Sequence, residues 1–220
     1  MKYYSIAIDG PAGSGKSTVA QSVARGLGFT YIDTGAMYRA VTVKALRLNI
    51  NLADEQCYDF LNDTCLVFKN QVMYLDGEDV SSQIVSQDVV NNVSLVSSLK
   101  SVRDNLVLKQ RQMAKGENVV MDGRDIGTNV LTNADLKIYL TATIDVRALR
   151  RYYDLKASGS SMSYDEVVAD LIRRDNFDTN RLHNPLKKAE DAVEIDSSEY
   201  TIEETAQEIM HLFKERVNYE

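Results

Sequence analysis

The sequence predicts an α/β protein built on a five-stranded parallel sheet with flanking helices. Two observations carry this prediction: short apolar, β-prone segments alternate with helix-like segments, and a glycine-rich turn follows the first of them. Such alternation is typical of parallel strands joined by helical crossovers. The expected strands are residues 3–8, 29–32, 119–122, 136–140 and 192–196.

The composition excludes several classes of protein. A formal net charge of −7 argues against a general binder of nucleic acid or of membrane surfaces, which carries a positive excess. Cys57 and Cys65 are too few for a zinc framework, and no apolar run approaches the roughly 18 residues of a membrane span. No secretory leader is recognised at the N-terminus. We therefore expect a cytoplasmic monomer with reduced thiols.

Residues 10–17 read GPAGSGKS and match the Walker A pattern GxxxxGKS/T at every fixed position. Glycines let backbone N–H groups converge on a phosphate, and the helix that follows adds its positive end. Lys16 is expected to reach the β- and γ-phosphates of ATP, and the Ser17 hydroxyl to bind Mg2+. The alternative is a turn that merely joins strand to helix. The predicted ATP-binding residues are Gly10, Pro11, Ala12, Gly13, Ser14, Gly15, Lys16, Ser17 and Thr18.

The second strand is followed by DTGAMYR at residues 33–39. Thr34 is expected to cap a helix that carries Arg39 one turn in. Open α/β sheets bind ligands just past their strand ends, so this helix start is a candidate binding site. An ordinary capped helix with a solvated arginine is the alternative.

Residues 48–101 lack the strand-helix rhythm of the rest of the chain. A β-hairpin is expected within residues 65–77, so we interpret this region as a β-rich insert. Residues 88–108 then read as a broken helix that carries Ser94 and Arg103. Taken alone, either residue is equally well explained as a surface position.

The third strand ends in Asp122, which is typical of a Walker B element that positions Mg2+. No glutamate follows it, although hydrolytic P-loop ATPases often carry a water-activating carboxylate there. The absence favours transfer to a bound acceptor. Arg124 and Asp125 follow at the mouth of the expected site.

After the fourth strand, a helix carries Arg147, Arg150 and Arg151 on one face, as expected where anions bind. Solvated charges paired with nearby carboxylates are the alternative.

In the next helix, Arg174, Asp178 and Arg181 share a face if the helix persists. They would bind sugar hydroxyls and a phosphate, or else form an intrahelical ladder of ion pairs. After the fifth strand, Thr201 and Glu204 form a capping box that opens the last helix.

These residues together favour phosphoryl transfer to an acceptor that is already ionised. We find a P-loop and many arginines but no evident general base. A nucleoside monophosphate fits, because its second phosphate pKa is about 6 and no base is needed at pH 7.

Four motifs in this order resemble the bacterial cytidylate kinase family: IDGPAGSGKS at 8–17, DTGAMYR at 33–39, DGRDIGT at 122–128 and RDNFDTNR at 174–181. The resemblance runs almost end to end. It implies a P-loop nucleoside monophosphate kinase fold with a β-rich insert and a short lid. The implied core is 1–32, 102–144 and 185–220, the monophosphate-binding region is 33–101, and the lid with its flanking helices is 145–184.

The resemblance also implies transfer of the γ-phosphate of ATP to CMP or dCMP, with Mg2+ bound by Ser17 and Asp122. The implied catalytic residues are Lys16, Arg124, Arg150 and Arg174. The implied CMP-binding residues are Thr34, Arg39, Ser94, Arg103, Arg124, Asp125, Arg174, Asp178 and Arg181. The three arginines Arg147, Arg150 and Arg151 would belong to the lid and close on the transferred group. A carboxylate such as Asp125 suits the N4 amino donor of cytosine, so CMP and dCMP should be preferred over UMP.

Three other functions are considered. A P-loop GTPase or ATPase switch would need NKxD and DxxG elements, which the sequence lacks. A small-metabolite kinase would not explain DTGAMYR together with RDNFDTNR. A non-catalytic ATP-binding regulator would bind ATP without acceptor-dependent turnover.

Overall fold

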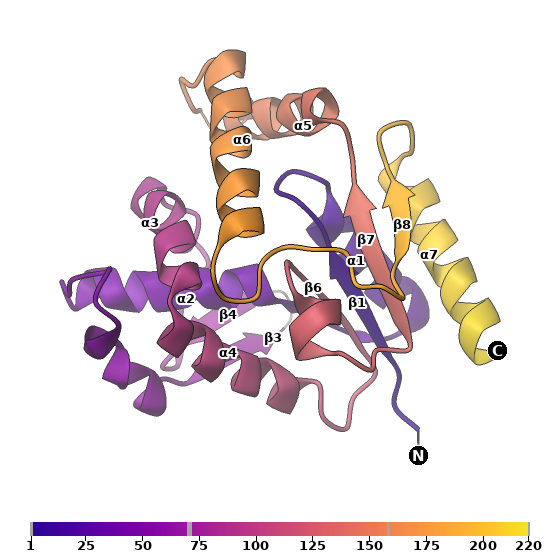
Figure 1. The fold of residues 1–220 in the computed structure, drawn as a ribbon, viewed down its shortest axis with the longest axis horizontal. Helices are drawn as coiled ribbons and strands as arrows, with labels where there is room; N and C mark the ends of the chain where they lie inside the picture. The colour runs from indigo at the N-terminus through magenta and orange to yellow at the C-terminus, as the bar shows by residue number, and fades with distance from the viewer. Residues whose placement is uncertain (1, 70–71, 158, 220) are drawn as a thin grey trace. The chain divides into compact units, whose positions relative to one another are not determined.

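The computed structural model describes residues 2–69, 72–157 and 159–219 (Figure 1). The chain divides into two compact units. The first consists of Met1–Tyr31 and Gly116–Glu220, and the second of Ile32–Lys115. Residues 70 and 71 of the predicted hairpin, and residue 158 of the predicted lid, lie outside the described residues.

The predicted five-stranded sheet is confirmed, with strand order β2-β6-β1-β7-β8. The central strand β1 pairs in parallel with β6 on one side and β7 on the other, and β7 pairs in parallel with β8. Because the strands are parallel, their carboxyl ends share one edge, where ligands of such sheets bind. The strands are β1 (Ser5–Asp9), β2 (Thr30–Asp33), β6 (Val119–Gly123), β7 (Leu136–Thr141) and β8 (Val193–Asp196).

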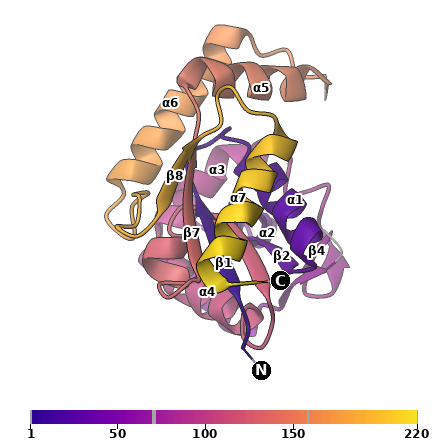
Figure 2. The same cartoon turned by 90° about the vertical axis from the view of Figure 1, so that its right-hand side faces the viewer.

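Helices connect these strands within the first unit. Two of them, α1 and α7, lie side by side over one face of the sheet (Figure 2). The predicted capping box of Thr201 and Glu204 opens α7, and a second one, of Ser163 and Glu166, opens α6. The helices are α1 (Lys16–Leu27), the one-turn helix η2 (Ile126–Val130), α5 (Ile144–Ala157), α6 (Tyr164–Asn180) and α7 (Ile202–Val217).

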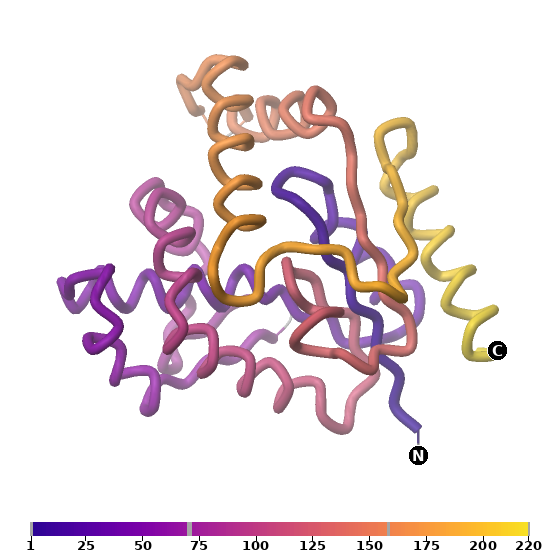
Figure 3. The backbone as a smooth tube through the Cα atoms, in the orientation of Figure 1, coloured from indigo at the N-terminus to yellow at the C-terminus, as the bar shows by residue number. Residues whose placement is uncertain are grey.

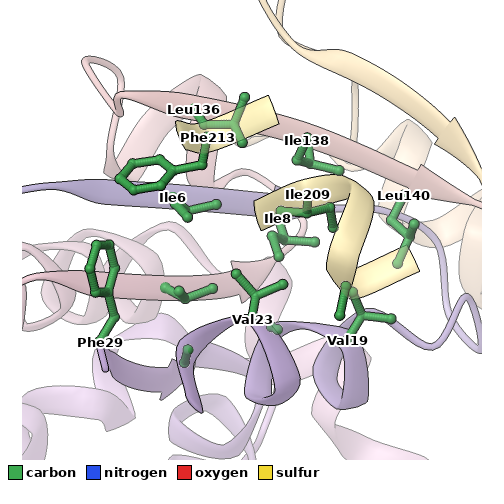
Figure 4. Close-up of a cluster of buried hydrophobic side chains, with 14 residues drawn as sticks. Ile6, Ile8, Val19, Val23, Phe29, Leu136, Ile138, Leu140, Ile209 and Phe213 are labelled. Carbon is green, nitrogen blue, oxygen red and sulfur yellow. The ribbon is translucent and has the colours of Figure 1, made fainter. Parts of the chain in front are cut away.

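The main core of this unit fills the space between the sheet and the pair α1 and α7 (Figure 4). Ile6 and Ile8 alternate along β1 and therefore point to the same face of the sheet, toward Val19 of α1. Phe213 of α7 meets the ring of Phe29 edge-on, with ring centroids 5.5 Å apart. This packing fixes β1 and α1 on either side of the glycine-rich turn.

A smaller cluster joins that turn to the last helices of the unit. Ala12 packs with Ala148 of α5 and with Val167 and Leu171 of α6. The path of the backbone from β1 into α1, and from α5 into α6, can be followed in Figure 3. The turn is therefore supported by packing on both of its sides.

The second unit contains helices and a small antiparallel sheet. The predicted hairpin is confirmed as part of this sheet, whose order is β3-β4-β5, but the residues before and after it are helical. The expected break within 88–108 is also confirmed: Leu99 is extended and separates α3 from α4. The elements are α2 (Thr34–Arg47), η1 (Glu55–Asp63), β3 (Leu66–Lys69), β4 (Val72–Leu75), β5 (Glu78–Asp79), α3 (Gln87–Ser98) and α4 (Lys100–Met113).

The prediction that Thr34 caps α2 is wrong by one residue. Asp33 is the N-cap, and its Oδ1 accepts a hydrogen bond of 2.8 Å from the backbone N–H of Ala36. Thr34 is instead the first helical residue and is buried. Aspartate is among the best N-cap residues, and its negative charge also suits the positive end of a helix.

Across the described ranges, no helix combines the length and the apolar character required to cross a bilayer.

The aromatic core yields the first testable prediction. Phe213→Ala should lower the free energy of unfolding by about 3–5 kcal/mol, because it empties a fully buried position. Urea unfolding followed by circular dichroism measures the change. Lys214→Ala, on the exposed face of the same helix, is the matched control and should change stability by less than about 0.5 kcal/mol. Equal stability of the two variants would contradict the assigned core.

Candidate active site

The glycine-rich turn has the backbone geometry of a phosphate-binding loop. Gly13 and Gly15 have φ values of 76° and 82°, which side-chain-bearing residues rarely adopt. A Cβ atom on Gly10 would overlap the backbone oxygen of Leu140, so this position has no room for a side chain. Gly15 caps α1, whose first turn carries no acidic residue that would repel an anion.

Lys16 and Ser17 begin α1 and lie where the sequence predicts. The buried ammonium group of Lys16 donates to the backbone oxygen of Pro11 at 3.0 Å, so the side chain curls back over the loop. The Ser17 hydroxyl donates to Oδ2 of Asp122 at 2.7 Å. The hydroxyl of Tyr31 donates to the other oxygen of the same carboxylate at 2.8 Å.

The pair of Ser17 and Asp122 fits a Mg2+ ion. Within the described part of the chain, no three His, Cys, Asp or Glu side chains lie together as a metal cluster. Mg2+ in kinase sites does not need one, because it is bound through one or two carboxylates together with substrate phosphates and water. One carboxylate and one hydroxyl at the end of the phosphate-binding loop meet this description. The sheet also explains the pairing: Asp122 lies opposite Ile8 in the register and so faces α1.

Four of the predicted CMP-binding residues form one ion-pair network. Arg124, just past β6, donates through Nε to Asp178 of α6 at 2.7 Å. Arg181 ends α6 and lies 3.8 Å from Asp178 and 3.3 Å from Asp125. The helix ends at Asn180, so Arg181 joins the network from an extended backbone and not from the helix face that was expected.

The charges in this network shift one another's pKa values. Burial alone would raise the pKa of Asp178, but the charge and hydrogen bond of Arg124, with Arg181 and Lys16, lower it below its usual range. Burial likewise opposes the charge of Arg124, but Asp178, Asp122 and Asp175 raise its pKa. The electrostatic influence of Lys16 on Asp178 links the phosphate-binding loop to the network.

Arg174 is placed differently from the prediction of a shared face with Asp178. Its Nε donates to Asp170 at 3.1 Å, and its buried Nη2 atom has no hydrogen-bond partner among the described residues. Burial lowers its pKa, Asp170 opposes this, and the nearby positive charges of Arg151 and Arg124 lower it further. A guanidinium group crowded by other cations is stabilised by an anion, which fits a phosphate-binding role.

The three arginines of α5 do not act as one group. Arg147 is buried and donates to the backbone oxygen of Ala12 at 2.9 Å and to Asp175 at 2.6 Å. Asp175 in turn accepts from the backbone N–H of Ala12 at 3.2 Å. Arg147 therefore supports the phosphate-binding loop from behind, whereas the expectation placed it on the transferred group. Arg150 donates to the backbone oxygen of Ser197 at 2.7 Å, with its Nη1 beside Gly15.

The second unit holds the remaining predicted CMP-binding residues. Arg39 pairs with Asp33 at 3.1 Å, and its Nε is buried without a hydrogen-bond partner among the described residues. Arg103 is buried, donates to the backbone oxygen of Ser97 at 3.0 Å and lies over the ring of Tyr38. Arg39, Ser94 and Arg103 come from α2, α3 and α4, three helices that contact one another.

Sequence reasoning missed two buried carboxylates of the first unit. Asp175 follows Arg174 within RDNFDTNR, and Asp9 directly precedes the glycine-rich turn, so both lie inside motifs that were recognised. Asp9 accepts backbone N–H groups from Ile126 at 2.7 Å and Gly127 at 2.8 Å. Burial raises the pKa of Asp9 to about 7, although these two hydrogen bonds act to lower it.

The fold and this site together define an ATP-dependent phosphotransferase of the P-loop type. Two solved structures share the fold: an uncharacterized protein from Eubacterium ventriosum and a gluconokinase from Sinorhizobium meliloti. The first is 13% identical with a TM-score of 0.53 and covers 97% of this chain and 99% of its own. The second is 15% identical with a TM-score of 0.50 and covers 98% and 94%.

Sequence comparison gives the family. The cytidylate kinase family model matches residues 6–215. A cytidylate kinase from Alkaliphilus oremlandii is 47% identical over 215 residues, which cover 97% of this chain and 99% of the relative. Another from Halalkalibacterium halodurans is 48% identical over 223 residues, which cover 99% and 100%. The chain belongs to the cytidylate kinase family.

The position of Arg147 yields a second prediction. Arg147→Met should lower the free energy of unfolding by about 3 kcal/mol and weaken ATP binding, because Asp175 loses its partner and Ala12 is released. Thermal unfolding and ATP titration measure the two effects. Arg173→Met, an exposed arginine of α6, is the control. A variant with native stability and native ATP affinity but reduced turnover would instead place Arg147 on the transferred group.

Proposed function

We propose that this protein transfers the γ-phosphoryl group of ATP to the phosphate of CMP or dCMP, giving ADP and CDP or dCDP. The carrying observation is the electrostatic link between Lys16 in the phosphate-binding loop and the network of Arg124, Asp178, Arg181 and Asp125. Membership of the cytidylate kinase family supports the choice of acceptor.

The donor side of the reaction follows from the loop. Backbone N–H groups at 10–18 are proposed to bind the phosphates of ATP, and Lys16 to exchange the Pro11 carbonyl for β- and γ-phosphate oxygens. Ser17 and Asp122 would hold Mg2+, which supplies positive charge at the phosphates when bound. Proposed ligands of the metal and of ATP thus share the first turn of α1.

The acceptor needs no general base. The phosphate of CMP has its second pKa near about 6, so at pH 7 one of its oxygens can attack the γ-phosphorus directly. The new P–O bond forms as the bond between the γ-phosphorus and the bridging oxygen breaks, and ADP leaves with that electron pair. The chain's task is to align the groups and to neutralise charge, which we assign to Lys16, Arg124, Arg150 and Arg174.

Recognition of the acceptor is proposed for residues of both units. In the first, Arg124 and Arg174 would bind the acceptor phosphate, Asp178 and Arg181 the pentose, and Asp125 the N4 amino group. In the second, Thr34 and Arg39 would bind the phosphate, and Ser94 and Arg103 the O2 and N3 acceptors of cytosine. A carboxylate oxygen can accept more than one hydrogen bond, so the Arg181 pair does not by itself prevent Asp125 from binding the base.

The division into core, monophosphate-binding region and lid remains a proposal. So do the monomeric state, the cytoplasmic location, and the absence of nucleic-acid and membrane partners, all of which rest on the composition of the chain.

A coupled assay of ADP formation from Mg-ATP tests the function, with CMP, dCMP, UMP, AMP or no acceptor. Strong turnover with CMP and dCMP alone is expected. Equal turnover without acceptor would make the protein an ATPase, and ATP binding without any turnover would make it a regulator. Turnover confined to AMP or UMP would overturn the choice of base.

Lys16→Ala should reduce kcat by about 10²–10³-fold, because it removes a positive charge that acts on the developing phosphate charge. The measurement is steady-state turnover with saturating CMP and ATP, with circular dichroism to show an intact fold. Lys187→Ala, an exposed lysine, should keep native turnover. Native activity in Lys16→Ala would refute the assignment of the loop.

Asp125→Ala should reduce the ratio of kcat/KM for CMP over UMP by about 10–100-fold, the worth of one well-placed hydrogen-bonded pair. Because Arg181 loses a buried partner in this variant, Asp125→Asn is measured beside it. The Asn side chain keeps its size and can donate to the uracil O4, so it should also lower the ratio. An unchanged ratio in both variants would place base recognition elsewhere.

A further inference from the structure

Asp9 is a buried carboxylate at the end of β1 to which no role in the reaction has been assigned above. Only 4% of its surface is exposed. Ile8, its neighbour, faces the core beneath α1 and α7, so alternation along the strand turns Asp9 to the opposite face. On that face the segment that follows β6 lies against β1.

Both oxygens of Asp9 are used on consecutive backbone N–H groups of this segment. Oδ1 accepts from Ile126 at 2.7 Å, and Oδ2 accepts from Gly127 at 2.8 Å. A buried carboxylate is costly unless it is hydrogen-bonded, so the side chain and the segment fix each other. The fit is close: a Cβ atom on Gly127 would lie 3.4 Å from Oδ2 of Asp9 and 3.1 Å from Cδ of Lys137.

The residue directly before these N–H groups is Asp125. Its φ and ψ of −145° and 29° belong to neither a helix nor a strand, so regular secondary structure does not hold its backbone. The peptide plane that contains the N–H of Ile126 also contains the carbonyl of Asp125. By holding that N–H, Asp9 sets the direction of the peptide plane and therefore of the Asp125 side chain.

The carboxylate of Asp125 is oriented from its other side by side chains. Its Oδ1 lies 3.3 Å from Arg181, and its Oδ2 accepts from the amide of Asn129 at 3.0 Å. These partners adjust to a movement of Asp125, whereas Asp9 is anchored in the middle strand of the sheet. Asp9 is therefore the fixed reference for this carboxylate.

We propose that Asp9 is a positioning residue for acceptor recognition, which sets the nucleobase selectivity of Asp125 without touching the nucleotide. The proposal rests on the proposed function, in which Asp125 reads the cytosine amino group. It joins the two halves of the site, because the residue that orients the base reader is also the residue from which the phosphate-binding loop begins.

Asp9→Asn is the decisive variant, since it keeps the shape but leaves one acceptor oxygen. Its amide nitrogen must face one of the two backbone N–H donors, so one hydrogen bond is lost. We expect the ratio of kcat/KM for CMP over UMP to fall about tenfold, the worth of a single lost hydrogen bond. The KM for CMP should rise while the KM for ATP stays within about twofold.

Two further variants separate positioning from general structural damage. Asp135→Asn is the matched control, because the carboxylate of Asp135 also accepts a backbone N–H of β1, that of Ser5 at 2.9 Å, at the opposite end of the strand. It should leave the CMP over UMP ratio unchanged. Gly127→Ala disturbs the same contact from the segment's side and should lower the ratio as Asp9→Asn does. It decides the question if Asp9→Asn fails to fold.

The outcomes are distinguishable. Loss of selectivity in Asp9→Asn and Gly127→Ala, with native selectivity in Asp135→Asn, supports the proposal. Native selectivity in a folded Asp9→Asn, with selectivity lost in Asp125→Ala, overturns it and leaves the proposed function standing. Equal rises in the KM values for CMP and ATP would also overturn it, since a merely structural role predicts them. A wild-type protein that does not prefer CMP over UMP would overturn both.

Discussion

The ion-pair network of Arg124, Asp178, Arg181 and Asp125 is the interaction on which the rest of the site depends. Charges taken out of water are stable only where each meets a partner, so these four side chains determine one another's positions. They also join the loop after β6 to the end of α6. An anionic substrate that enters such a network meets arginines already held in place, which lowers the cost of ordering them on binding.

The phosphate-binding loop depends on a parallel arrangement on its other side. Its glycines adopt the required backbone angles, but the position of Ala12 is set by Arg147 and Asp175 from α5 and α6. The loop is thus attached to the two helices that the family resemblance assigns to the lid. A movement of those helices and a change at the loop would share one set of contacts, which is a physical route for coupling ATP binding to closure.

Much of the fold was predictable because it rests on local patterns. All five strands, the break near Leu99 and the capping box at Thr201 follow from spacing and residue type over a few neighbours. The cap of α2 was misplaced because Asp33 and Thr34 are both good N-cap residues, and the choice between them depends on where the strand before them ends. The helices around the small sheet were missed because the alternating hairpin dominates that region.

The sequence by itself determined the order of strands and helices, the phosphate-binding loop with Lys16 and Ser17, and the carboxylate of Asp122, since each depends on chemistry within one motif. Only the tertiary structure decided which carboxylate each arginine meets. Asp178 lies 54 residues from Arg124, and Asp9 lies 117 residues from the N–H of Ile126. Contacts over such separations leave no periodic trace in a sequence, because they are set by how the strands order and the helices pack.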